Sequence, residues 1–214
     1  MASAIVIGEG KMAAFLTKLL CSSGTPVALY GGGRTVRDSI EAQLQKHVEE
    51  TYPLQFVDDL KHQQDMVSRL MENLRMTDDA SRLHGEVIID ATRIPNSPLL
   101  RVVRRFVPAA PVMSLNESGS DEKTIFVHLY EPFEITRIAQ IVPSASSDAS
   151  SIARIRSLLS KANVVEVNAE QGDFAEKALN AWREHDSSTP QLERVIASIV
   201  PSRSPVDQSQ SVMH

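Results

Sequence analysis

The first thirty residues contain a strand, a tight turn and a helix in immediate succession, and this constrains the fold more than any other stretch. An apolar run at 4–7 leads into the turn GEGKMA at 8–13, and apolar residues at helical spacing follow as far as Leu20. A second apolar run at 26–30 comes after the length of chain that one crossover helix needs. The sequence therefore predicts a βαβ unit with parallel strands, at the start of an α/β domain.

The turn at 8–13 has the spacing with which dinucleotide-binding folds hold a pyrophosphate. Gly8 permits the sharp turn, Gly10 lets the backbone approach the phosphates, and the small Ala13 lets helix and strand pack closely. The N–H groups at Lys11 and Met12 are expected to face the phosphates. The pattern by itself is weak evidence for nucleotide binding, and the prediction depends on its position between a strand and a helix. The alternative is an α/β turn that binds no nucleotide.

The second strand ends in glycine where a dinucleotide fold normally has an acidic residue. An Asp or Glu at this place binds the ribose hydroxyls of NAD, and here the place belongs to Gly31. Arg34 could instead bind the 2′-phosphate of NADP, but it equally suits a solvated position at the start of the next helix. NAD and NADP both remain candidate cofactors, and loss of binding is the third possibility.

The rest of the chain alternates helical and strand-like segments, as a doubly wound sheet requires. Helical spacing between 35 and 74, interrupted at Tyr52-Pro53, predicts a helical hairpin inserted after the second strand. Strands are expected at 75–77, 86–92, 111–115, 124–129, 135–142 and 164–167, and helices at 98–106, 149–162, 173–184 and 191–200, with one helical turn after Asp78 and Asp79. We predict a Rossmann-like, mostly parallel domain over 1–185. A tail at 186–214 follows, with one short amphipathic helix and a disordered end.

Composition indicates an ordinary globular protein and excludes several partners. The chain has 214 residues, enough for one sizeable domain, and its net charge of -5 argues against nucleic-acid binding. No apolar run approaches the about 20 residues of a membrane span. Cys21 is the single cysteine, so an intracellular, reducing compartment is expected, either cytoplasm or mitochondrial matrix. The first strand begins almost at once, so no targeting segment is expected, and no metal site is predicted.

Five segments together resemble the NAD-binding domain of the L-3-hydroxyacyl-CoA dehydrogenases. They are GEGKMA at 8–13, VIIDA at 87–91, LNES at 115–118, VHLYEPFEITRIAQIV at 127–142 and NVVEVNAEQGDFAEKAL at 163–179. The family's matching pieces read GxGxMG, a strand ending in EA, NTSS, MHFFNP followed by KLVEV, and VVVxDxPGFxxNR. The segments of this chain occur in the same order as the family's pieces, and near the same spacing, over residues 4–184. The resemblance rests on this shared order rather than on any single segment.

The resemblance implies NAD-dependent oxidation of a 3-hydroxyacyl-CoA. In that family a histidine takes the hydroxyl proton, a glutamate orients and stabilises the histidine, and a serine binds the substrate oxygen. The histidine falls on His128 and the serine on Ser118, but the glutamate falls on Gln140, whose neutral amide stabilises an imidazolium less well. Glu131 or Glu134 is the candidate replacement carboxylate. The expected cofactor-binding residues are Gly8, Gly10, Lys11, Met12, Ala13, Gly31, Arg34, Ala91, Thr92 and Asn116.

The family's second, helical domain has no counterpart in this sequence, since only 30 residues follow Glu184. That domain covers the acyl-CoA cleft and makes the dimer. We therefore expect a catalytically impaired structural or regulatory subunit of a larger assembly, a pseudoenzyme. The alternative is an active NAD(P)-dependent 3-hydroxyacyl-CoA dehydrogenase of fatty acid metabolism, completed by a partner chain and binding acyl-CoA. A single-domain NADP-dependent reductase of another Rossmann family is disfavoured, because its Tyr-x-x-x-Lys pair is missing.

A contact surface is expected near the C-terminal end of the domain. Removal of a helical domain should leave apolar surface at Phe174, Leu179 and Trp182. We expect residues 191–200 of the same chain, or another subunit, to cover it. The alternative is that Trp182 completes only its own core.

Overall fold

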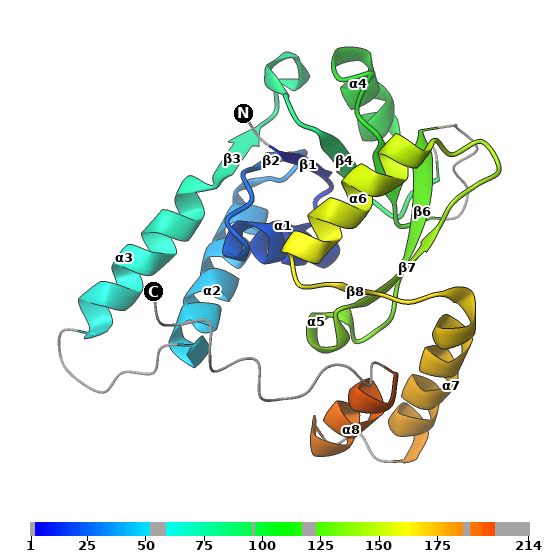
Figure 1. Ribbon diagram of the computed structural model, residues 1–214. Coiled ribbons are helices and arrows are strands. Elements are labelled where there is room, and N and C mark those ends of the chain that lie inside the picture. The colour runs from blue at the N-terminus through cyan, green and yellow to red at the C-terminus, as the bar shows by residue number, and fades with distance from the viewer. Residues whose placement is uncertain (1–2, 52–58, 96, 117–122, 186–188, 200–214) are drawn as a thin grey trace. The chain divides into compact units, whose positions relative to one another are not determined.

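A computed structural model of the protein describes residues 3–51, 59–95, 97–116, 123–185 and 189–199 (Figure 1). The chain divides into two compact units. The first comprises Met1–His128 with Ile141–Val165, and the second comprises Leu129–Gln140 with Glu166–His214. The predicted disordered end at 201–214 lies outside the described residues.

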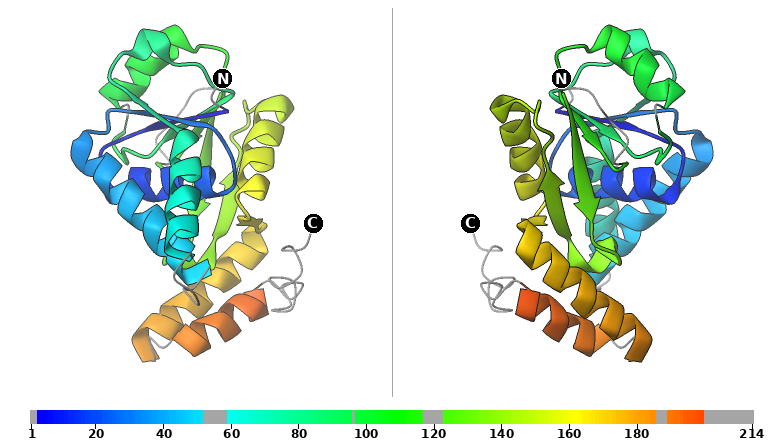
Figure 2. Two further views of the ribbon diagram at one scale, coloured as in Figure 1. Left: turned by 90° about the vertical axis from the view of Figure 1, so that its left-hand side faces the viewer. Right: turned by 90° about the vertical axis from the view of Figure 1, so that its right-hand side faces the viewer.

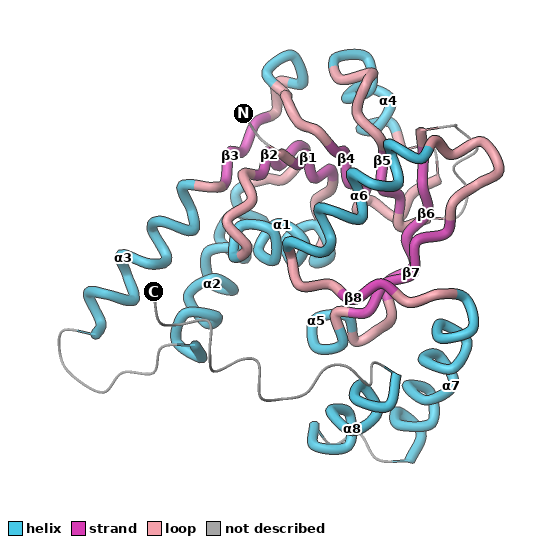
Figure 3. The backbone as a smooth tube through the Cα atoms, in the orientation of Figure 1, coloured by secondary structure: helices cyan, strands magenta, loops and turns pink. Residues whose placement is uncertain are grey.

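The strands form one eight-stranded sheet in the order β3-β2-β1-β4-β5-β6-β7-β8 (Figure 3). Their bounds are β1 Ala4–Ile7, β2 Val27–Tyr30, β3 Leu74–Thr77, β4 Val87–Asp90, β5 Val112–Ser114, β6 Thr124–Leu129, β7 Ile138–Val142 and β8 Val165–Glu166. Neighbours from β3 to β6 pair in parallel. The order reverses at β1, from which the chain first moves outwards to β3 and then returns to β4. The predicted Rossmann-like, mostly parallel sheet is confirmed.

Helices lie between the strands and after the last of them, and all but α5 are near the places where the sequence predicts them. Their bounds are α1 Lys11–Ser22, α2 Arg34–Thr51, α3 Asp59–Glu72, the 3-10 turn η1 Ala80–Arg82, α4 Pro98–Phe106, α5 Phe133–Thr136, α6 Ala149–Lys161, α7 Ala169–His185 and α8 Thr189–Ile199. Helices α2 and α3 pack against each other and against α1, which confirms the helical hairpin after the second strand. In the second unit, α7 and α8 lie side by side in both views of Figure 2.

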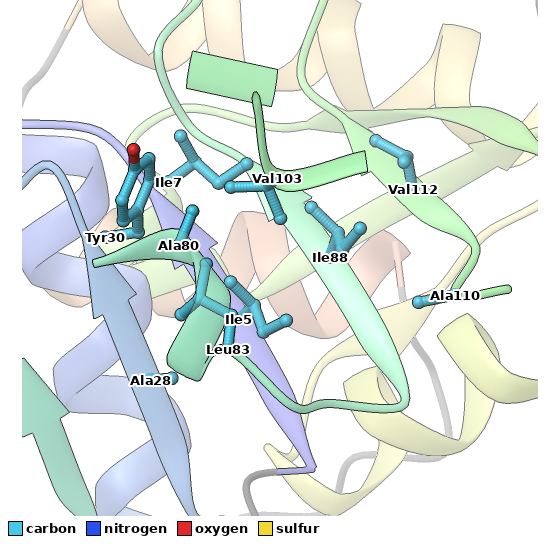
Figure 4. Packing of buried hydrophobic residues seen from close by; sticks show 10 residues of the cluster. All are labelled: Ile5, Ile7, Ala28, Tyr30, Ala80, Leu83, Ile88, Val103, Ala110 and Val112. Carbon is cyan, nitrogen blue, oxygen red and sulfur yellow. The ribbon is translucent and has the colours of Figure 1, made fainter. Parts of the chain in front are cut away.

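The core forms on both faces of the central strands. All residues of β1, β2 and β4 are buried, as is typical of parallel strands covered on both sides. Ile5 pairs with Ala28 and Ile88, so these side chains share one face, which Leu83 of the η1 region and Val103 of α4 cover (Figure 4). Helix α1 packs against β1 and β2. The strand ends are therefore held in fixed positions.

The structure corrects the predicted strand at 135–142. Residues Phe133–Thr136 form the short helix α5, and β7 begins only at Ile138. Phe133 is fully buried, and the Thr136 hydroxyl donates to the carbonyl oxygen of Tyr130 at 2.7 Å. Arg137, with φ of 48°, then ends the helix in the left-handed region. Burial of Phe133 and the Thr136 hydrogen bond favour a turn over the strand that the β-branched residues predict.

Helix α7 starts before the predicted residue 173. The Asn168 side-chain oxygen accepts from the backbone N–H of Gln171 at 2.8 Å, and the Gln171 side-chain oxygen accepts from the backbone N–H of Asn168 at 3.1 Å. This reciprocal pair is a capping box, which satisfies N–H groups at the start of a helix. The helix therefore begins at Ala169.

We expect Asp148 to stabilise the first unit in a pH-dependent way. Its carboxylate caps α6 by accepting from the backbone N–H groups of Ser150 at 2.8 Å and Ser151 at 2.9 Å. Hydrogen bonds from Ser150 and Ser151 hold the pKa of Asp148 well below its usual range. The stabilisation is therefore present above the ordinary Asp pKa of about 4 and is lost as the pH falls towards the native value.

Asp148→Ala should lower the melting temperature at pH 7, and the difference from the wild type should shrink below about pH 4. Thermal unfolding followed by circular dichroism between pH 7 and pH 3 measures this. Asp65→Ala, an exposed change on α3, is the control and should have little effect. A difference that stays constant down to pH 3 would contradict the capping role.

Candidate functional site

Gly8 lies where α1 comes closest to the sheet. Its φ is +142°, and a Cβ there would lie 3.2 Å from the Ala13 Cβ and 3.4 Å from the Ala91 carbonyl carbon. The Gly8 N–H donates to the Tyr30 carbonyl oxygen at 3.2 Å, and the Ala91 N–H donates to the Ile7 carbonyl oxygen at 3.0 Å. Only glycine at position 8 and a small residue at position 13 allow this close approach. The ends of β1, β2 and β4 are thereby held together under the start of α1.

Gly10 leaves the N-terminus of α1 open. It is the N-cap residue, it is exposed, and a Cβ added to it would meet nothing within 4 Å. The first N–H groups of an α-helix have no acceptor within the helix, so those of Lys11 and Met12 are available by helix geometry to an external acceptor. Glu9 and Lys11 are both exposed beside this opening, so they bring opposite charges to it. The geometry fits an approaching phosphate.

The end of β2 is shaped by a contact that the sequence alone does not reveal. Gly31 has φ of +81°, and a Cβ there would lie 2.9 Å from Cδ1 of Leu99. Gly33 is the residue before α2, and its carbonyl oxygen accepts from the backbone N–H of Arg37 at 3.3 Å. Arg34 is therefore the first residue of the helix, and its side chain is exposed. Its position suits both interpretations of Arg34.

The loops after β4 and β5 are held by short polar side chains. Asp90 is buried at the end of β4, and its Oδ1 accepts from the backbone N–H of Thr92 at 3.1 Å and from the Thr92 hydroxyl at 2.6 Å. Asn116 donates from its backbone N–H to the Ser114 hydroxyl at 3.1 Å and from its side-chain amide to the Arg93 carbonyl oxygen at 3.3 Å. Thr92 and Asn116 thus lie in loops at the same edge of the parallel sheet as Gly8.

Asp90 and Ser114 are absent from the predicted set, although each is the last residue of a buried strand. The charge of Asp90 acts on Arg104 of α4: burial lowers the pKa of Arg104, and the Asp90 carboxylate opposes that shift. Arg104 also donates to the hydroxyl of Thr124 at 2.5 Å. A polar residue that ends an apolar strand was the sequence signal for this network.

The predicted catalytic residues have different surroundings. His128 is half-buried in β6, and its ring packs edge-on against Phe126 with centroids 6.2 Å apart. Glu131 is exposed, and its Oε2 accepts from the backbone N–H of Phe133 at 3.3 Å. Ser118 lies outside the described residues. The catalytic roles of these residues stay predictions.

Gln140 belongs to a tightly packed group in the second unit. Its side-chain oxygen accepts from the Tyr130 hydroxyl at 2.8 Å. A Cβ at Gly172 of α7 would overlap the Tyr130 hydroxyl and lie 2.7 Å from the Gln140 oxygen. Burial raises the pKa of Tyr130, and the carboxylates of Glu176 and Asp173 add to the shift. Tyr130 therefore remains a neutral hydrogen-bond donor, and Gln140 is its acceptor.

Helix α8 covers part of the surface that was expected to need a partner. Leu179 of α7 and Leu192 and Ile199 of α8 are buried where these helices pack together. Trp182 is half-buried, whereas Phe174 remains 51% exposed. Of the two expected occupants, the structure contains the chain's own helix, and contact with another subunit stays a prediction.

Other candidate chemistry is limited in the described part of the chain. Cys21 is buried, as expected for a structural thiol, and burial raises its pKa to about 12. No three His, Cys, Asp or Glu side chains come together as a metal site among the described residues. None of the described helices combines the length and apolar character needed to cross a membrane.

Comparisons with known proteins identify similar structures only. No family model matches the sequence, and no curated protein does so. FadB2 of M. tuberculosis superposes with a TM-score of 0.59 at 14% identity, over 92% of this chain and 77% of that one. The (S)-3-hydroxybutyryl-CoA dehydrogenase PaaH1 of Ralstonia eutropha gives 0.62 at 10% identity, over 78% and 63%. The 3-hydroxybutyryl-CoA dehydrogenase of Escherichia coli gives 0.57 at 16% identity, over 86% and 43%.

At these low identities, the similarity to the three solved structures shows only that the fold is shared. The chain spans less than half of the E. coli chain and 63% of the R. eutropha chain. The resemblance to the NAD-binding domain of 3-hydroxyacyl-CoA dehydrogenases is confirmed at the level of the fold, and activity and substrates remain to be proposed.

The two glycines of the first loop should respond differently to substitution. Gly8→Ala should destabilise the protein by at least about 1 kcal/mol, because its φ is positive and its surroundings are closed. For a chain of this size that corresponds to a melting temperature about 3 °C lower. Gly10→Ser should leave the melting temperature unchanged or raise it, since serine is a good N-cap and the space is open. Equal losses in both variants would contradict this assignment.

Proposed function

We propose that this chain is a dinucleotide-binding protein of the 3-hydroxyacyl-CoA dehydrogenase type that lacks the helical substrate domain. In this proposal it is catalytically impaired and serves as a structural or regulatory subunit of a larger assembly. The proposal of nucleotide binding rests on one observation about the first loop. The turn at Gly8 is crowded by its neighbours, whereas the N-terminus of α1 beside it, at Gly10, is open to a ligand. The dehydrogenase fold of similar structures supports it.

The residues at the sheet edge fit the parts of a dinucleotide. The pyrophosphate would lie at Gly10, where the N–H groups of Lys11 and Met12 provide donors. The adenosine half would lie at the end of β2, and the nicotinamide half towards Thr92 and Asn116 at the ends of β4 and β5. When bound, the nicotinamide supplies a hydride donor or acceptor.

The end of β2 favours NADP(H) over NAD(H). Gly31 provides no carboxylate for the ribose hydroxyls. Arg34 and Arg37 are exposed in the first turn of α2, which contains no acidic residue. The positive end of the helix dipole and two guanidinium groups favour a 2′-phosphate at this place.

The groups that replace the family's glutamate support impaired catalysis. Gln140 carries no charge, and its amide oxygen accepts the Tyr130 hydroxyl hydrogen bond. Glu131 is exposed, and it accepts a hydrogen bond from the chain that starts α5. A histidine that removes a hydroxyl proton needs a partner that stabilises its cation. In this proposal the neutral Gln140 takes the place of the family's glutamate, so His128 would be a weaker base than the histidine of that family.

Nucleotide titration tests the binding proposal. We expect NADP and NADPH to bind the purified chain at least about tenfold more tightly than NAD and NADH in calorimetry. Arg34→Ala should reduce the affinity for NADPH by about 10- to 100-fold, which is the loss expected when one hydrogen bond to a charged group is removed. The variant should also lose the preference for NADP(H) over NAD(H). Gly10→Ser should weaken all four nucleotides without loss of stability, because its hydroxyl competes for the helix N–H groups.

Lys46→Ala, farther along α2 and exposed, is the matched control and should bind like the wild type. Absence of binding by all four nucleotides would overturn the proposed nucleotide function. A preference for NAD would retain the nucleotide function but contradict the assignment of Arg34.

A turnover assay tests the proposed impairment. Wild-type protein should not reduce acetoacetyl-CoA with NADH or NADPH, because the neutral Gln140 stands where the family has the glutamate that stabilises the histidine cation. Turnover that disappears in His128→Ala would contradict the impairment and favour the active enzyme completed by a partner. Turnover that survives in His128→Ala would exclude His128 as the base.

A further inference from the structure

We propose that Leu99 determines which dinucleotide this chain accepts, by occupying the space that an acidic residue at the end of β2 would need. The inference deepens the proposed nucleotide function and rests on it. Leu99 lies in the first turn of α4, whereas Gly31 directly follows β2. The two segments are far apart in the sequence, and the fold brings them into contact.

A side chain at position 31 would require the end of the Leu99 side chain to move aside. A Cβ at Gly31 would lie 2.9 Å from Leu99 Cδ1, 3.8 Å from its Cδ2 and 4.0 Å from its Cγ. These three nearest atoms all belong to Leu99, so a single side chain limits the space beside Gly31. The φ of +81° adds backbone strain for residues other than glycine.

Leu99 is partly buried at the edge of the core. It packs against the buried cluster that includes Ile7, Tyr30 and Val103, which Figure 4 shows on one face of the sheet. Ile7 and Tyr30 are the last residues of β1 and β2. Moving Leu99 aside would therefore disturb packing at the strand ends that frame the nucleotide loop.

The position of Leu99 gives it a role in specificity as well as in packing. In doubly wound folds the adenosine ribose binds at the end of the second strand. An acidic side chain there accepts hydrogen bonds from its two hydroxyls. Leu99 places methyl groups in that space, where a carboxylate would lose hydration without gaining a partner. Arg34 begins α2 nearby in sequence and is exposed, so recognition of a phosphate remains possible. Leu99 thus disfavours the NAD type of recognition, and the exposed Arg34 favours the NADP type.

Four variants separate specificity from packing: Gly31→Asp, Leu99→Ala, the double variant of both, and Gly31→Asp with Leu100→Ala. Leu100 is the matched control, because it is the next residue of α4, packs against the same cluster and is not among the nearest neighbours of the Gly31 position. Calorimetry gives the dissociation constants of NADH and NADPH for each variant. Thermal unfolding is recorded in parallel.

We expect Gly31→Asp alone to lose at least tenfold in affinity for both nucleotides. Combined with Leu99→Ala it should bind NADH at least tenfold more tightly than the wild type does, and more tightly than NADPH. With Leu100→Ala it should behave like the single variant. Where Leu99→Ala does not fold, Leu99→Val keeps most of the apolar contact and shortens the side chain.

The inference is overturned if the Leu99 and Leu100 combinations behave alike, or if Gly31→Asp gains NADH affinity without any change at 99. A wild type that binds no dinucleotide overturns the proposed function. In that case NADH binding by the Gly31→Asp, Leu99→Ala protein would still support the role of Leu99, and its absence would overturn both.

Discussion

The close approach of α1 to the ends of β1 and β4 at Gly8 is the constraint on which the rest of this fold depends. The distances to Ala13 and Ala91 leave little space for a side chain, and the positive φ of Gly8 disfavours one. This approach fixes where the helix N-terminus lies relative to the carboxyl edge of the sheet. Every loop at that edge, from Gly31 to Asn116, is then positioned by parallel pairing with β1 or its neighbours.

The polar side chains of this edge serve mainly to hold the backbone. Asp90 fixes the loop through Thr92, and Ser114 fixes Asn116. In the second unit Tyr130 and Gln140 form a neutral pair under Gly172. Buried polar groups that are fully hydrogen-bonded specify one arrangement, and a replacement would leave a partner unsatisfied. Gln140 thus accepts a hydrogen bond within the second unit.

Local signals explain which parts of the fold could be predicted from the sequence. The first βαβ unit, the α2 and α3 hairpin and the cap of α6 by Asp148 follow from periodicity and capping within short stretches. The early start of α7 was also readable, because Asn168 and Gln171 have capping-box spacing. The short helix α5 was not, since it depends on burial of Phe133, which the pattern of the local sequence does not specify.

The candidate site also has one part that local sequence predicts and another that depends on distant contacts. Gly8, Gly10 and Ala13 could be placed because their roles belong to one turn. The reason for glycine at 31 could not be found, because it depends on a residue of another helix. Ser118 lies outside the described residues, so its role is as open in the structure as in the sequence.

The contact between Gly31 and Leu99 also has an evolutionary consequence. An acid introduced first at position 31 would overlap Leu99, and a smaller residue introduced first at position 99 would leave a void above the core. In the proposal for Leu99, each single step is therefore expected to be disfavoured and the two changes together to be compatible. The effect of a change at either position is therefore expected to depend on the residue at the other, which is epistasis between positions 31 and 99.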